Sequence, residues 1–181
     1  MLVGILGWKR EKLPELLKLC KNISSECSKK GDIIFTGGSS GFMGAGNQGA
    51  FIINRNNSIG YGCKCIIDRE PHNNFILKKN YEMCETFHER KAKIMHNKDV
   101  LLFFPGGIGT LDEFMDFINL QKTGYLTRKT HVILVGNEYW NTLKNWFEIN
   151  NVDFPHQHIT LISENFNEII QTLNSIRSKI D

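Results

Sequence analysis

The 181-residue chain lacks the features that mark membrane, secreted and multidomain proteins. It has no run of about 18 apolar residues, so no membrane-spanning helix is predicted. The segment from Met1 to Trp8 has neither a cationic leader nor a small-residue cleavage site, and it is predicted to be a first strand rather than a signal peptide. Because no linker, internal repeat or low-complexity tract divides the chain, we expect one domain over residues 1–181.

The chain also lacks a large excess of charge of one sign. The 22 basic and 19 acidic residues leave a formal net charge of +3. This excess is too small to favour nucleic-acid binding, but it suits a small anionic ligand. The hydrophobic content of 41% and the charged content of 23% are typical of a globular protein. We therefore expect a small-molecule partner, and neither a nucleic acid nor a membrane.

The five cysteines form an odd set that lacks zinc-site spacing. Cys63 and Cys65 lie in an alternating, strand-like segment, in which their side chains point the same way. Free thiols in a reducing cytosol are the preferred interpretation of the set. The sequence thus predicts a cytoplasmic protein without a metal.

Hydrophobic periodicity predicts strands that alternate with helices. Strands are expected at residues 2–7, 33–35, 58–67, 99–104, 131–135 and 159–162. Helices are expected around residues 13–23, 41–54, 80–97, 111–121, 139–149 and 166–176. Repeated strand–helix alternation without hairpin signals predicts an α/β fold, in which a doubly wound, mainly parallel sheet carries helices on both faces.

Two glycine-rich turns, at residues 36–44 and 105–110, follow predicted strands and open predicted helices. Such turns bind phosphates, because glycine lets the backbone approach the anion and the helix dipole adds positive potential. Neither turn continues into the Gly-Lys-Ser/Thr of a P-loop, and Gly107-Ile108-Gly109 lacks the third glycine of a dinucleotide fingerprint. Glycine also serves tight turns structurally. The pair of turns nevertheless favours a phosphate ligand.

Residues 105–113, Pro-Gly-Gly-Ile-Gly-Thr-Leu-Asp-Glu, resemble the PGGxGTxxE motif of the LOG family. These are cytokinin-activating nucleotide phosphoribohydrolases, often mislabelled as lysine decarboxylases. The segment from Phe87 to Met95 resembles the family's RKxxM helix, and residues 36–44 resemble its GGGxxGLMG loop. The resemblance runs from about residue 30 to residue 150.

Departures from the family pattern concern the substrate. Trp8, Ser39 and Thr130 stand where the family has serine, glycine and proline. The segments 47–50 and 70–73 look closer to relatives that act on ordinary nucleotides or bind molybdenum cofactor.

The resemblance implies a Rossmann-like fold and a specific hydrolysis. The substrate is a nucleoside 5′-monophosphate, AMP or a cytokinin riboside 5′-monophosphate, and the products are the free base and ribose 5-phosphate. As the base departs, the ribose gains oxocarbenium character, which a carboxylate can stabilise while it orients the attacking water. By resemblance Glu113 is this carboxylate, and Arg90 contacts the base or ribose and holds the carboxylate. Substrate-binding residues are expected to be Gly38, Met43, Gly44, Glu70, Lys91, Gly106, Gly107, Ile108, Gly109 and Thr110. The scheme requires no metal and no cofactor.

Each catalytic candidate also has a plainer interpretation. Thr110-Leu111-Asp112-Glu113 matches a capping box, in which Glu113 would only bond back to the start of its helix. Arg90 could be a solvated helix cation. Met43 is expected to pack at the edge of the pocket.

Three hypotheses follow for the whole protein. The first is the phosphoribohydrolase. The second is a non-catalytic carrier of a phosphorylated ligand such as molybdenum cofactor, and the third is a nucleotide sensor. Arg90 and Glu113 favour the enzyme, because a carrier does not need a group that stabilises a ribosyl cation. A homodimer built on the helices around 80–97 and 110–122 is also expected.

Overall fold

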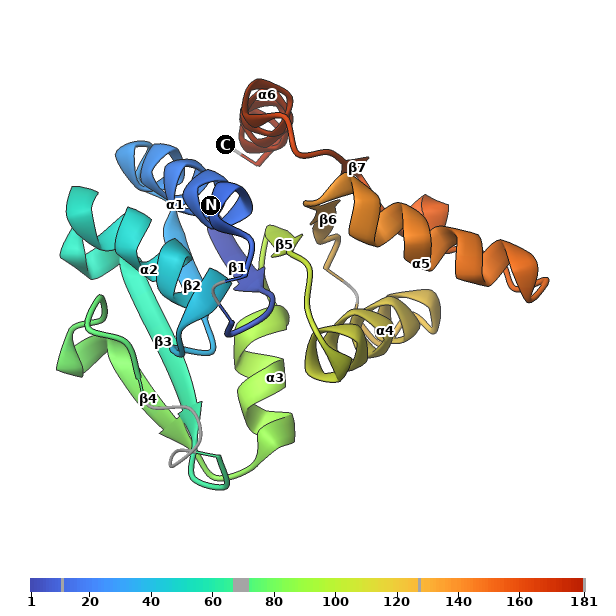
Figure 1. The fold of residues 1–181 in the computed structure, drawn as a ribbon. Coiled ribbons are helices and arrows are strands. Elements are labelled where there is room, and N and C mark those ends of the chain that lie inside the picture. The colour runs from blue at the N-terminus through green and yellow to red at the C-terminus, as the bar shows by residue number, and fades with distance from the viewer. Residues whose placement is uncertain (11, 67–71, 127, 181) are drawn as a thin grey trace.

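The computed structural model describes residues 1–10, 12–66, 72–126 and 128–180 (Figure 1). Its parallel strands are β1 (Leu2–Leu6), β2 (Ile33–Thr36), β3 (Ser58–Cys63), β4 (Tyr81–Cys84), β5 (Val100–Phe103), β6 (His131–Leu134) and β7 (Leu161–Ile162). The helices are α1 (Pro14–Lys29), α2 (Gly41–Ile53), α3 (Phe87–Met95), α4 (Ile108–Lys122), α5 (Asn137–Ile149) and α6 (Phe166–Arg177). The strand order β4-β3-β2-β1-β5-β6-β7 confirms the predicted α/β fold with a parallel sheet.

The helices divide between the two faces of the sheet, and a hydrophobic core fills each face. One core joins the sheet to α1, α2 and α6, and the other joins it to α3, α4 and α5. Strand β5 contributes apolar side chains to both faces of the sheet. Val100 and Leu102 belong to the first core, whereas Leu101 and Phe103 belong to the second, and all four are buried. A continuous apolar run is what a strand covered on both sides requires.

The helix predicted over 80–97 is wrong in its first half. Tyr81–Cys84 forms the edge strand β4, which pairs with β3 and aligns Cys84 with Cys63. The helix begins only at Phe87, since the Thr86 hydroxyl accepts a hydrogen bond from the Glu89 N–H at 3.1 Å. The Glu89 carboxylate in turn accepts one from the Glu85 N–H at 2.9 Å. This capping arrangement of Thr86 and Glu89 is readable in the sequence.

The strand order places a topological switch at the centre of the sheet. From β1 the chain builds outward through β2, β3 and β4, and it then returns to the other side of β1 with β5. The chain after β1 leads to α1 on one face, and the chain after β5 leads to α4 on the other. Loops that diverge in this way leave a crevice at the carboxyl ends of the two strands, where ligands of open α/β sheets bind. Among the described helices, none is long and apolar enough to cross a bilayer.

Candidate functional site

The loop after β5 delivers an uncapped helix N-terminus to the switch point. Helix α4 begins at Ile108, and its N-cap residue Gly107 provides no side-chain cap. The first backbone N–H groups of an α-helix lack partners within the helix, and the helix dipole is positive at this end. Gly106 is required by the local packing, because a Cβ at this position would lie 2.0 Å from the Thr110 Oγ1 atom. The geometry fits an anionic group.

A cavity of about 260 Å³ opens in front of this helix end. Its walls come from the loop after β1, from α2, from α3 and from the start of α4. The lining residues are Gly7, Trp8, Lys9, Met43, Phe87, Arg90, Gly107, Ile108, Gly109, Thr110 and Glu113. The structure thus brings together the two predicted catalytic residues and five of the predicted substrate-binding residues, namely Met43, Gly107, Ile108, Gly109 and Thr110.

Arg90 is a buried component of this cavity, so its interpretation as a solvated helix cation is wrong. Arg90 is only 4% exposed. The guanidinium donates from Nε to the Tyr61 carbonyl at 2.9 Å and from Nη2 to the Gly37 carbonyl at 3.0 Å. The ring of Phe87 lies beneath it, with its centroid 5.6 Å from the Arg90 Cζ atom. Bonds to two fixed carbonyls hold the cation in one orientation.

Gly37 is a position of the candidate site that the sequence analysis missed. A Cβ atom at this residue would lie 2.0 Å from Arg90 Nη2 and 2.8 Å from Met43 Sδ. Only glycine therefore lets the guanidinium reach the Gly37 carbonyl. The signal in the sequence is the glycine pair at 37–38, but its partner Arg90 is 53 residues away.

Glu113 is half-buried on the α4 wall of the same cavity. The capping-box interpretation required α4 to begin after Thr110. The helix instead begins at Ile108, because Gly107 already has the extended backbone of an N-cap residue. Thr110 is consequently the third residue of the helix and Glu113 the sixth, so the capping box is wrong. The Glu113 carboxylate shares the cavity with the cations Lys9 and Arg90.

Lys91 points away from the cavity. Its Nζ lies 3.0 Å from a carboxylate oxygen of Asp112 and 3.0 Å from one of Asp116, so it links α3 to α4. Burial alone would lower the pKa of Lys91, but the hydrogen bonds to Asp116 and Asp112 outweigh it and raise the pKa. Lys91 is accordingly not among the residues that line the cavity.

Three further predicted binding residues, Gly38, Gly44 and Gly106, are not in the lining of this cavity. Gly38 has a left-handed backbone with φ of 73°, and its carbonyl accepts hydrogen bonds from the backbone and side chain of Asn73 at 2.7 and 2.9 Å. Gly44 faces a neighbouring cavity between α1 and α2. Glu70 lies outside the described residues.

The loop after β1 joins both glycine-rich turns. The Trp8 N–H donates to the Pro105 carbonyl at 3.0 Å, and the Trp8 carbonyl accepts from the Phe42 N–H at 3.1 Å. The backbone of one residue thereby connects the turn at 36–44 to the turn at 105–110. Two cations lie over the indole ring of Trp8: Arg10 Cζ is 5.2 Å and Lys12 Nζ is 5.8 Å from the ring centroid.

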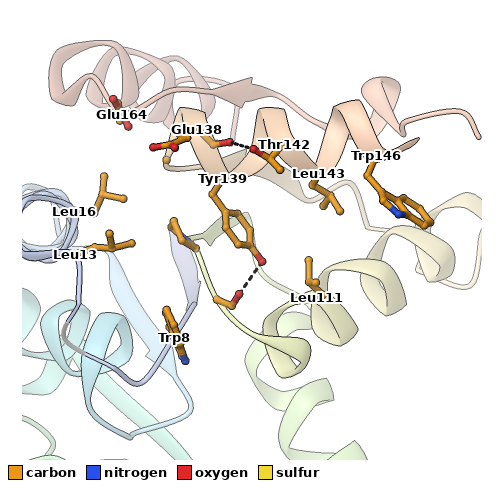
Figure 2. Close-up of a pocket in the computed structure, with 13 residues that line it drawn as sticks. Trp8, Leu13, Leu16, Leu111, Glu138, Tyr139, Thr142, Leu143, Trp146 and Glu164 are labelled. Carbon is orange, nitrogen blue, oxygen red and sulfur yellow. Dashed lines mark hydrogen bonds between the residues drawn. The ribbon is translucent and has the colours of Figure 1, made fainter. Parts of the chain in front are cut away.

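A larger cavity of about 590 Å³ lies on the other side of this loop (Figure 2). It shares Trp8 with the first cavity, and its walls are mostly apolar side chains from α1, α4 and α5, such as Leu16, Leu111 and Leu143. Figure 2 shows the Tyr139 ring pointing to the loop after β5, where its hydroxyl donates to the Gly106 carbonyl at 2.8 Å. Burial raises the pKa of Tyr139.

In the part of the chain that the structure describes, no group of three or more His, Cys, Asp or Glu side chains could hold a metal ion.

Comparison with known proteins relates this chain to nucleotide hydrolases in sequence. A family model described as possible lysine decarboxylase matches residues 43–173. The cytokinin riboside 5′-monophosphate phosphoribohydrolase LOG1 of Arabidopsis thaliana is 28% identical over 121 residues, which cover 67% of this chain and 55% of the relative. The probable cytokinin riboside 5′-monophosphate phosphoribohydrolase LOGL6 of Oryza sativa subsp. japonica is 25% identical over 154 residues, which cover 83% of this chain and 60% of the relative. The chain thus spans little more than half the length of these plant relatives.

Solved structures resemble the chain along nearly its whole length. The molybdenum cofactor binding protein of Rippkaea orientalis superposes with a TM-score of 0.69 at 18% identity, covering 97% of this chain and 96% of its own. The molybdenum cofactor carrier protein of Chlamydomonas reinhardtii gives a TM-score of 0.66 at 14% identity, with 98% of each chain covered. At these identities the likeness establishes a shared fold.

Proposed function

Because the chain belongs to the family of possible lysine decarboxylases, to which the LOG phosphoribohydrolases are assigned, we propose that it hydrolyses the N-glycosidic bond of a nucleoside 5′-monophosphate. The products are the free base and ribose 5-phosphate. The observation that carries this proposal is one cavity that unites the α4 N-terminus, the buried guanidinium of Arg90 and the carboxylate of Glu113.

The start of α4 binds the 5′-phosphate in this proposal. The backbone N–H groups of residues 108–110 and the Thr110 hydroxyl supply the donors, and Lys9, from the loop after β1, adds a positive charge to the same cavity. Hydrogen bonds to an ionised phosphate are stronger than those between neutral groups. A substrate anchored here extends its ribose towards Glu113, five residues further along the helix than Ile108.

Glu113 acts on the ribose. Cleavage of the bond between C1′ and the base leaves positive charge on the sugar ring, and a carboxylate beside the ring stabilises that charge. The same carboxylate orients the attacking water and accepts its proton. Arg90 holds the base or ribose from the α3 side, in a position that the Tyr61 and Gly37 carbonyls fix. This scheme uses neither a metal nor a cofactor.

The substrate is identified by incubating the purified protein with a panel of nucleoside monophosphates, including AMP and a cytokinin riboside 5′-monophosphate, and by measuring the released base by chromatography. Release of base and of ribose 5-phosphate in equal amounts supports the proposal. Binding of a nucleotide without release of base would reject it.

The alternative is a non-catalytic carrier of a phosphorylated ligand such as molybdenum cofactor. It is supported by the fold shared with molybdenum cofactor carriers. A carrier needs the helix N-terminus and the glycine turns but has no use for Glu113 beside the ribose. The enzyme is therefore our first proposal, and the nucleotide panel separates the two.

We also propose that two copies of the chain associate through α3 and α4. The apolar face of α4 over residues 111–121 offers little surface for this contact, because Phe114, Phe117 and Ile118 are buried within the protomer. The remaining support is Ile108, which is 88% exposed at the edge of the cavity. Light scattering tests the proposal: a monomer mass at micromolar concentration, with activity intact, would reject it.

A further inference from the structure

Two cysteine thiols lie side by side where β3 ends. Cys63 is the last residue of the strand and is buried, whereas Cys65 is exposed two residues later. Their Sγ atoms are 2.8 Å apart. The backbone itself makes this pair, since the Ile66 N–H donates to the Cys63 carbonyl at 3.1 Å and closes a turn. The Lys64 N–H donates to the Cys84 carbonyl at 3.2 Å and ties the turn to β4.

The other three thiols have different surroundings. Cys20 and Cys27 are buried in the core beneath α1, and desolvation raises their pKa values far above the ordinary range. Cys84 is buried on β4 opposite Cys63, and burial raises its pKa as well. The hydrogen bond with Cys63 raises the pKa of Cys65 too, so its exposure is what distinguishes it: Cys65 is the accessible thiol of the five, and its neighbour within bonding reach is Cys63.

We propose that Cys63 and Cys65 form a reversible disulfide by exchange with low-molecular-weight disulfides. The Cys65 thiol loses its proton to solvent, and the thiolate attacks the small disulfide, forming a mixed disulfide and releasing one small thiol. The Cys63 thiolate, after losing its own proton, attacks the Cys65 sulfur and releases the second small thiol. Two protein thiols are thereby oxidised to one disulfide, and the small disulfide is reduced to two thiols.

A disulfide at this turn acts on the candidate active site through β3. Tyr61, two residues before Cys63 on the strand, provides the carbonyl that accepts the Arg90 Nε–H. A disulfide fixes the separation and dihedral angle of its two side chains, so the turn and the strand end must adjust. Oxidation therefore displaces Arg90 and lowers turnover. This functional consequence rests on the proposed hydrolase activity, whereas the disulfide itself does not.

Peptide mapping tests the disulfide directly. The reduced full-length protein is incubated with oxidised glutathione, its remaining thiols are alkylated, and the protein is digested with trypsin. Because Lys64 separates the two cysteines, cleavage after Lys64 leaves their peptides joined only when the disulfide is present. We expect this joined pair, lighter by two hydrogen atoms than its reduced parts and lost on treatment with dithiothreitol. Cys84→Ser should behave like the wild type, and Cys65→Ser should give no joined pair.

Three results would overturn the proposal: full alkylation of both cysteines after treatment, a glutathione adduct that persists on Cys65, or a Cys63–Cys84 link. For the functional consequence, kcat of the oxidised wild type should fall and recover with reductant, while kcat of Cys65→Ser stays unchanged by oxidised glutathione. An oxidised protein with undiminished kcat would refute the coupling to Arg90. If the reduced protein has no turnover, the proposed function fails, and the peptide map still decides the disulfide.

Discussion

Replacing Glu113 with glutamine removes one negative charge from the cavity and preserves the shape of the side chain. Glu113 lies well inside α4 and is half-buried, and glutamine favours helices about as well as glutamate does. We therefore expect the free energy of unfolding to change by less than about 1 kcal/mol. Any large loss of activity in Glu113→Gln then reflects chemistry rather than folding.

The size of the expected loss follows from the charge on the sugar. At about 4 Å and an effective dielectric constant near 20, a carboxylate and a full positive charge attract by about 4 kcal/mol. Because the ribosyl charge is partial and develops only in the transition state, we expect kcat to fall by about 10²-fold or more, roughly 2.7 kcal/mol of lost stabilisation. The KM should change little, since the phosphate is bound by the start of α4 instead.

The assay is release of free base from the best substrate of the nucleotide panel, measured under saturation. Glu138→Gln is the matched control, because it makes the same chemical change at an exposed carboxylate in the larger cavity beyond Trp8. This control should keep the wild-type kcat. If Glu113→Gln also keeps it, the carboxylate does not stabilise the ribosyl cation, and the carrier becomes the leading hypothesis.

Four further predictions concern Gly37, Lys91, the phosphate of the substrate and Lys98. Gly37→Ala places a Cβ against the Arg90 guanidinium, so kcat should fall by about tenfold or more with an unchanged circular dichroism spectrum; wild-type kcat would show that the Gly37 bond is dispensable. Lys91→Met should lower the free energy of unfolding by about 1 kcal/mol in chemical denaturation and leave KM unchanged, whereas a raised KM would return Lys91 to the substrate. A nucleoside lacks the phosphate, and with each charge-assisted bond worth roughly 1.5–3 kcal/mol its kcat/KM should be at least about tenfold below that of its monophosphate; similar values would mean that α4 binds something else. Burial lowers the pKa of Lys98 from 10.5 to about 8, so between these values the unfolded chain binds a proton at Lys98 that the folded chain has released, and the contribution of Lys98 to stability rises with pH. The free energy of unfolding of the wild type relative to Lys98→Met should therefore rise across this window, and a difference that does not change with pH would contradict the assignment.

The sequence was sufficient for features that depend on neighbouring residues. The apolar run at residues 99–104 predicted the strand β5, and the glycine-rich turns predicted that a helix follows each of β2 and β5. It was insufficient where distant segments decide the outcome. Tyr81–Cys84 is too short to show a period, and its pairing with β3 makes it a strand. The role of Gly37 depends on its contact with Arg90. Lys91 is directed away from the cavity by the two aspartates of α4 that it binds.

The position of Trp8 gives the protein an internal optical signal. Of its three indoles, Trp140 is fully buried in the core and Trp146 is 55% exposed, whereas Trp8 is half-buried between the two cavities. The Trp8 backbone is bonded to both glycine turns, and its ring lies beneath two cations. An anion that enters at α4 changes the electric field and the solvent at this ring. Intrinsic fluorescence should therefore follow ligand binding without any label, and the signal should be absent from a Trp8→Phe variant that still binds.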